Sequence, residues 1–245
     1  MALDDDLSPE DEQRRRHLVQ MLSVGALTMT PLAALQAAWW GSEPEKLPDD
    51  KSIFSLEGDV QVNRSRADEN TRIRAGDVVR TGLDSEIVFA VGSDSFILRS
   101  NSQMQIEGGG FFVNALRLLT GSVLSVFGNR NNNQQLTMNS STATIGIRGT
   151  GVYMEAERDL TYLCTCYGQV ELASTLDSND REVITAEHHD SPKYITNQSS
   201  GRSRIQPAPF INHTDTELKL LEAIVGREVP FGMELDIYEG ERRDY

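Results

Sequence analysis

Two cysteines and two adjacent histidines are the residues of this chain whose types and spacing could do chemistry. Cys164 and Cys166 are separated by one residue inside the segment 161–168, which we interpret as a β-strand. Residues two apart on a strand point to the same face, so both thiols should project together. Two thiolates and an imidazole could supply three ligands to zinc, copper or iron. The sequence therefore offers Cys164, Cys166, His188 and His189 as a possible metal site.

The same cysteines admit two other interpretations. A Cys-x2-Cys pair wraps a metal in a tight turn, whereas Cys-x-Cys on a flat strand is less suited to this. The thiols could instead be small buried hydrophobic groups. They could also form a strained disulfide, because their α-carbons would lie about 6.5–7 Å apart in an extended strand. Adjacent histidines point in opposite directions if extended, so at most one of His188 and His189 would face the thiols.

Catalysis has little support in the sequence. There is no nucleophile elbow, no His-Glu-x-x-His and no paired-carboxylate motif. Asp190 beside His189 could orient an imidazole, but neighbours in sequence do not by themselves define a geometry. We therefore predict that the protein is not an enzyme.

The charge of the chain excludes some partners. With 23 basic and 37 acidic residues, its formal net charge is −14. Nucleic acids and anionic membrane surfaces both require a basic face, so neither is an expected partner. The hydrophobic fraction of 38% is that of an ordinary globular protein.

The N-terminal region has the layout of an export signal. Arg14, Arg15 and Arg16, followed by His17, precede the uncharged run 18–40. The paired arginines are typical of a twin-arginine signal, whose machinery carries folded cargo and would suit a protein that acquires metal before transport. No clean Ala-x-Ala site follows, so an uncleaved anchor stays open. We predict residues 1–40 to be a signal or anchor and the protein to be periplasmic, touching a membrane only through that segment.

The rest of the chain is dominated by strand patterns. Residues 41–52 contain Pro44 and Pro48 and predict a linker. Residues 53–186 consist of short apolar-alternating runs with turn residues at intervals of about ten, which indicates an all-β sandwich, barrel or solenoid. The runs are 60–62, 77–80, 86–89, 95–98, 122–126, 151–154, 161–163 and 169–172. No repeat of fixed length is present, so the pattern alone does not establish a regular solenoid.

Two segments have helical spacing. In 111–119, Phe112, Ala115, Leu116 and Leu119 recur at the helical period, and we expect a short helix there. The second helix is expected over 214–225, within a C-terminal extension of residues 187–245. Its Thr214 and Glu217 form a capping-box pattern, and Gly226 is placed to end it. The tail after residue 230 is acidic and should be exposed.

Four short motifs, in order, resemble the FecR-like domain family. They are Glu-Gly-Asp-Val at 57–60, Ala-Gly-Asp-Val-Val-Arg-Thr-Gly at 75–82, Leu-Thr-Gly-Ser-Val-Leu at 119–124 and Thr-Ala-Thr-Ile-Gly-Ile-Arg-Gly-Thr-Gly at 142–151. The resemblance covers residues 53–173. It implies a periplasmic, solenoid-like or sandwich-like β-domain, which in the best-known members relays the state of an outer-membrane receptor to a sigma factor. Those members carry a cytoplasmic anti-sigma segment, for which the residues before the apolar run are too few, so we expect no direct regulation of a sigma factor.

The family motif also has a physical interpretation. Gly146, Gly149 and Gly151 allow backbone turns or close approach, and they match no phosphate-binding pattern. Arg148 could pair with a carboxylate or contact a partner. A tight strand crossover with a structural arginine is the favoured explanation.

These observations leave competing functions. The first is an exported, non-catalytic FecR-like module for sensing and protein interaction, with an envelope or outer-membrane protein as partner. The alternative is a periplasmic metal-binding protein that uses the Cys-x-Cys and His-His residues with zinc, copper or iron. A third is a scaffold that docks through the 214–225 helix and the acidic tail.

Overall fold

The computed structural model describes residues 45–130, 136–198 and 203–231. The predicted signal or anchor at 1–40 and nearly all of the acidic tail lie outside these residues. From Leu47 onward the described residues belong to one compact unit. None of its helices is long and apolar enough to cross a membrane.

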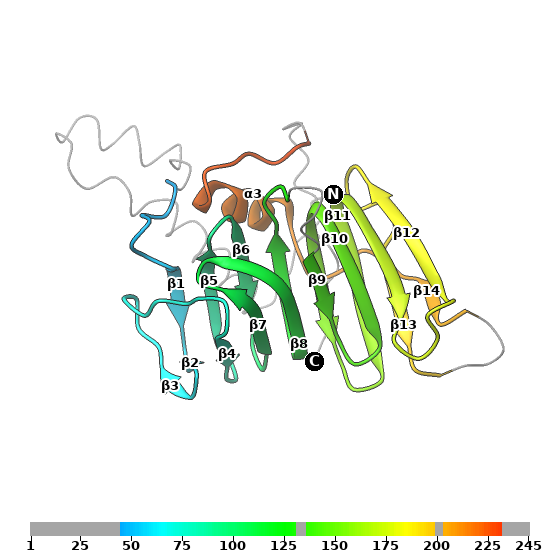
Figure 1. Cartoon of the computed structure of the whole chain (residues 1–245), viewed down its shortest axis with the longest axis horizontal. Helices are drawn as coiled ribbons and strands as arrows, with labels where there is room; N and C mark the ends of the chain where they lie inside the picture. The colour runs from blue at the N-terminus through cyan, green and yellow to red at the C-terminus, as the bar shows by residue number, and fades with distance from the viewer. Residues whose placement is uncertain (1–44, 131–135, 199–202, 232–245) are drawn as a thin grey trace, which may run out of the picture. The chain divides into compact units, whose positions relative to one another are not determined.

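The described unit consists of β-strands with one short helix, which confirms the predicted all-β class (Figure 1). The strands are β1 (Ile53–Glu57), β2 (Val60–Val62), β3 (Ser65–Arg66), β4 (Val78–Thr81), β5 (Glu86–Val91), β6 (Asp94–Leu98), β7 (Gln103–Gly109), β8 (Phe112–Val126), β9 (Leu136–Asn139), β10 (Ala143–Ala156), β11 (Leu160–Ser174), β12 (Arg181–Ala186), β13 (Lys193–Thr196) and β14 (Ile205–Pro207). The helix is α3 (Asp215–Ile224). All neighbouring strands pair antiparallel except β8 and β9, which are parallel.

Three long strands change partners half-way and thereby divide the sheet into two layers. The second half of β8 lies between β6 and β10, whereas its first half lies between β7 and β9. One layer, which we call the helix-side layer, has the strand order β1-β5-β6-β8-β10-β11-β13-β14. The other, which we call the opposite layer, has the order β3-β2-β4-β7-β8-β9-β10-β11-β12. The long strands β8, β10 and β11 contribute one half to each layer. The strands of the C-terminal extension, β13 and β14, continue the helix-side layer.

The strands turn between layers at glycines. Gly121 in β8, Gly149 in β10 and Gly168 in β11 all have positive φ, of 82°, 56° and 86°. A side chain at Gly168 would place its Cβ 2.6 Å from the carbonyl oxygen of Gly149. Only glycine adopts this conformation without strain, so the glycine motif of β10 lies at a bend. Arg148, beside the bend, pairs with Glu171 on the surface.

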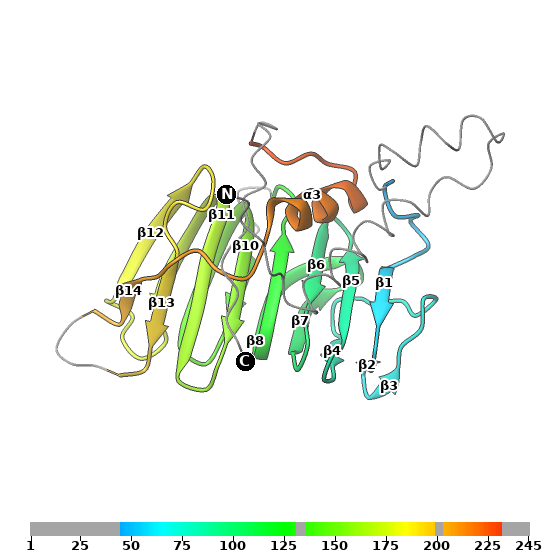
Figure 2. The same ribbon diagram turned by 180° about the vertical axis from the view of Figure 1, so that it is seen from behind.

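The central strands of the helix-side layer are buried on both faces. Phe96, Val123, Met154 and Leu163 point into the apolar core between the layers. The residues that alternate with them face α3, which packs against β6 and β8 (Figures 1 and 2). A cross-strand row of this kind runs through Ile97, Leu124, Tyr153 and Cys164, and all four are buried. Cys164 therefore lies on the face that the helix covers.

The helix predicted at 111–119 is wrong, since residues 112–126 form β8. Val113, Leu116 and Leu118 are buried there, while Phe112 and Leu119 are 38% and 40% exposed. Register shifts in the pairing of β7 with β8 interrupt the strict alternation of a strand and produce a spacing that imitates a helix. Hydrogen bonding to β7 and β9 then overrides the local pattern.

The predicted C-terminal helix is confirmed. Thr214 is its N-cap, and its side chain accepts the amide of Glu217 while the Glu217 carboxylate accepts the amide of Thr214. This capping box satisfies two amides that have no partner within the helix. Gly226, with φ of 75°, follows the last turn.

Candidate metal centre

Strand β11 brings the two cysteines together. Cys164 and Cys166 are both fully buried, neither forms a disulfide, and the intervening Thr165 points to the other face. Tyr153, the cross-strand neighbour of Cys164 on β10, lies on the same face. The period of a β-strand is thus enough to aim both thiols at the face of the layer on which α3 packs.

A tight turn after β12 adds His189. The carboxylate of Asp190 accepts the amides of Glu187 at 2.6 Å and His188 at 3.1 Å. His189 itself has φ of 56°, and its amide donates to the carbonyl of Cys166 at 2.9 Å. This turn holds the buried imidazole of His189 over the thiols.

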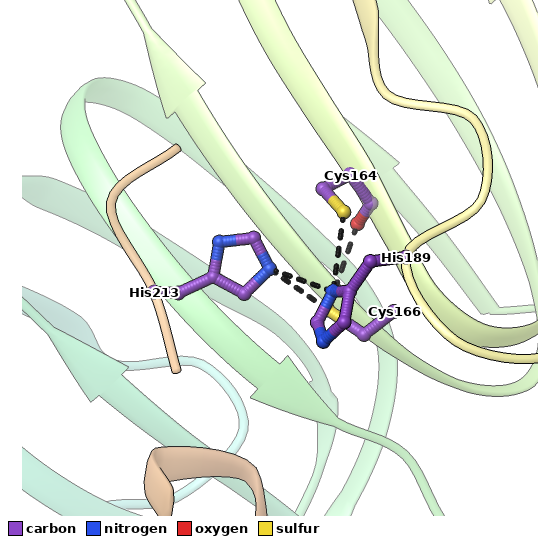
Figure 3. Close-up of side chains that lie close together, drawn as sticks. All are labelled: Cys164, Cys166, His189 and His213. Carbon is purple, nitrogen blue, oxygen red and sulfur yellow. Dashed lines mark hydrogen bonds between the residues drawn. The ribbon is translucent and has the colours of Figure 1, made fainter. Parts of the chain in front are cut away.

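The fourth member of the cluster is His213, which directly precedes the N-cap of α3. Its ring stacks on Tyr153, with centroids 4.5 Å apart and planes 22° apart. Its Nδ1–H donates to the carbonyl of Ile211 at 2.7 Å. The other ring nitrogen, Nε2, consequently points towards the cysteines (Figure 3).

Three of the distances between the four potential ligand atoms match the spacing of a tetrahedral metal site. All four atoms lie within 4.8 Å of one another. Cys164 Sγ lies 3.5 Å from His189 Nδ1, Cys166 Sγ lies 3.4 Å from His213 Nε2, and the two nitrogens are 3.2 Å apart (Figure 3). A tetrahedral zinc ion with bonds of about 2.05 Å to nitrogen and about 2.3 Å to sulfur would space its ligands about 3.3 Å (N to N) and about 3.6 Å (N to S) apart. The observed distances agree with these values to within about 0.2 Å.

The outer hydrogen bonds assign a tautomer to each imidazole. His189 Nε2–H donates to Asp215 Oδ1 at 3.1 Å, and the Nδ1 proton of His213 is committed to Ile211. Both inner nitrogens then carry lone pairs and face each other at 3.2 Å. Each of these nitrogens also lies within hydrogen-bonding distance of a sulfur, Cys164 for His189 and Cys166 for His213, so the four atoms can either share protons or bind a cation.

The two thiols of the cluster differ in acidity. Burial acts to raise the pKa of Cys164, but hydrogen bonding to Cys166 and the nearby His213 and His189 outweigh it and lower the pKa well below its usual value. Burial and the neighbouring Cys164 raise the pKa of Cys166. One sulfur is therefore already prepared to bind as thiolate.

Asp215 is the outer partner of the site. Its hydrogen bonds with His189 and His188 overcome the effect of burial and lower the pKa of its carboxyl group. The same contact raises the pKa of His189 against the effect of burial. A carboxylate behind a ligating histidine is the usual arrangement that orients the ring and increases its basicity.

Of the four residues predicted as ligands, the structure brings three into the cluster. His188 is not one of them, because its Nε2 contacts Asp215 Oδ1 at 2.9 Å and its side chain is 36% exposed. His213 takes its place and was missed by the sequence analysis. The available signal was its position immediately before a recognisable helix N-cap and two residues before an aspartate.

The family-motif residues lie elsewhere. Gly146, Arg148 and Gly149 line a groove of about 970 Å³ together with Arg130 and Glu171. Gly151 is in close contact with Tyr167, where an added Cβ would come within 2.5 Å of the ring. This motif thus shapes the strand bend rather than the cluster of thiols and imidazoles.

No protein-family model matches the chain, and no curated protein matches it. Two crystal structures from Parabacteroides distasonis are similar to it, both of proteins provisionally assigned as anti-sigma factors. One, at 2.50 Å resolution, has 11% sequence identity and a TM-score of 0.42, with 54% of this chain and 58% of that chain covered. The other, at 1.65 Å, has the same identity and TM-score, with 60% and 74% covered. The chain thus spans less than two thirds of the first of these proteins, and membership of the FecR-like family stays a prediction from the sequence.

Proposed function

We propose that this protein is a metal-binding module in which Cys164, Cys166, His189 and His213 hold a single Zn²⁺ ion. The observation that supports this most strongly is the convergence of two imidazole lone pairs and two sulfurs within 4.8 Å, in a fully buried place. One tetrahedral ion uses all four atoms. Two thiolates with two imidazoles suit zinc. The d electrons of Zn²⁺ impose no coordination geometry, so the ion can adapt to ligands supplied by four separate side chains.

The proposed role of the ion is structural or regulatory, not catalytic. A catalytic zinc site keeps a position for water or substrate, whereas here the protein supplies four ligands. The ligands are also covered by Phe210, whose ring lies 4.4 Å from that of His189 and 4.5 Å from that of His213. A substrate would have to displace both a ligand and this cover.

Metal content per chain tests the proposal. The protein is expressed with its own N-terminal region, purified, and analysed by native and elemental mass spectrometry. We expect about one zinc per wild-type chain and loss of the ion in Cys164→Ser and His213→Ala. His188→Ala is the matched control, because it removes a neighbouring imidazole that does not face the thiols. A metal-free wild type after growth and refolding in zinc would refute the proposal.

We also propose that the module is exported and acts without catalysis as a sensing or interaction unit in the envelope. The support is the arginine-led apolar run at 14–40 and the ordered FecR-like motifs. Replacement of Arg15 and Arg16 by lysine should retain the protein in the cytoplasm if the twin-arginine route is used. Crosslinking in intact cells should then recover an envelope or outer-membrane partner with the wild type alone. Unchanged fractionation of the double variant would remove the twin-arginine assignment.

A further inference from the structure

We infer that the metal ion controls whether the C-terminal strap, residues 210–227, stays docked on the helix-side layer. This rests on the proposed function and adds a consequence to it. The ion would then be a signal, and the position of α3 would be the response.

The origin of the ligands supports this inference. Cys164 and Cys166 belong to β11 inside the sheet, whereas His213 belongs to the strap. A bound ion is therefore a direct bond between the sheet and the residue before α3. A second connection runs from the ligand His189 through Asp215, the first residue of the helix.

Besides the ion, the strap is docked by the buried apolar side chains Leu218, Leu221 and Ile224 and by buried polar pairs. The polar pairs are of a kind that contributes little net stability. Glu217 pairs with the buried Arg99 at 2.7 Å, and Glu222 accepts the Tyr167 hydroxyl. Asp215, Glu217 and Glu222 are all at most 5% exposed. Desolvation of buried charges offsets most of what the pairing gains. A helix of ten residues is also not stable on its own, so α3 depends on its docking.

Removal of the ion weakens the attachment of the strap. His189 Nδ1 and His213 Nε2 still lie 3.2 Å apart, and the bond that the ion made between the sheet and the strap is lost. A displaced His213 draws Thr214 and the capping box with it. An ion that binds only the docked state shifts the equilibrium by its whole binding free energy.

The core between the layers does not share this dependence. Its residues, such as Phe89, Phe96 and Met104, form an apolar cluster that includes none of the four ligands. The structure thus separates a metal-dependent strap from a metal-independent sandwich. This separation is what an experiment can detect.

Hydrogen exchange with mass spectrometry on the full chain tests the inference, with zinc-loaded protein compared with protein stripped by a chelator. Amides of α3 should exchange at least about tenfold faster after removal of the ion, while those of β5 and β6 stay protected. His213→Ala in saturating zinc should resemble the stripped wild type, and His188→Ala should resemble the loaded protein.

Three results overturn the inference, and they are distinguishable. Unchanged protection of α3, with loss of the ion proved by mass spectrometry of the same sample, removes the strap mechanism but keeps the metal site. Simultaneous loss of protection in α3, β5 and β6 would mean that the ion stabilises the whole fold and not the strap alone. A wild type that never binds zinc refutes the proposed function and the inference together.

Discussion

Asp215 accepts hydrogen bonds from His189 and His188 and is also the first residue of α3. It has two physical effects there: it fixes the ring of a ligand, and it places negative charge at the positive end of the helix dipole. The first effect concerns the metal, and the second concerns the helix. Substitutions can separate them.

Asp215→Ala should weaken zinc affinity about 10- to 100-fold, as is usual when the partner of a ligating histidine is removed. Asp215→Asn keeps an acceptor oxygen for His189 and should lose less. Competition with a chromophoric chelator gives the dissociation constants. Equal losses for both variants would mean that the charge, and not the hydrogen bond, is what matters.

At the scale of the element, the strand bends depend on backbone conformations that other residues cannot adopt cheaply. Gly168→Ala should destabilise the unit by about 2 kcal/mol or more, because it combines positive φ with a Cβ 2.6 Å from a carbonyl oxygen. Gly146→Ala, in the straight part of β10, is the matched control, since its Cβ meets nothing closer than 3.6 Å. Urea unfolding measures both. Equal losses of unfolding free energy in the two variants would show that the bend at Gly168 does not require glycine.

Asp94, at the start of β6, should make the stability of the fold depend on pH. Burial raises the pKa of Asp94 despite its ion pair with Arg130 and its bond to the Gly128 amide. The folded state then binds this proton more tightly than the unfolded chain does. The stability that Asp94 contributes should therefore fall as the pH rises from its usual pKa of 3.8 towards the raised value.

The check is the free energy of unfolding of wild type minus that of Asp94→Asn, measured in urea at several pH values from about 3.5 to 6. Other titrating groups cancel in this difference. We expect it to decrease with pH over the lower part of the range. An increase would mean that the Arg130 pair outweighs burial and that the carboxylate stabilises the strand.

For the whole molecule, the metal site links stability to the supply of zinc. An ion that binds only the folded chain stabilises it by about 2.7 kcal/mol at a free concentration one hundred times the dissociation constant. Addition of a chelator should accordingly lower the Tm of the wild type. Cys164→Ser should start from the lower Tm and not respond to zinc or chelator. A chelator-insensitive wild type with bound metal would show that the ion also binds the unfolded chain.

Much of the architecture could be predicted from the sequence because it is local. Alternation with turn residues gave the strands, and Thr214 with Glu217 gave the helix start, since capping involves residues three apart. The shared face of Cys164 and Cys166 follows from the period of a strand. The segment 111–119 was mistaken for a helix because its strand is defined by distant partners, β7 and β9, and not by its own spacing.

What only the tertiary structure decided is which histidines meet the thiols. His188 is adjacent to His189, yet the turn fixed by Asp190 sends only one ring inwards. His213 lies far along the chain and reaches the site because α3 packs on the outer face of the helix-side layer. Sequence determined the donor types and the direction of the thiols, since both are properties of single residues and one strand. The complete set of four needed the packing of three separate segments, which no local pattern encodes.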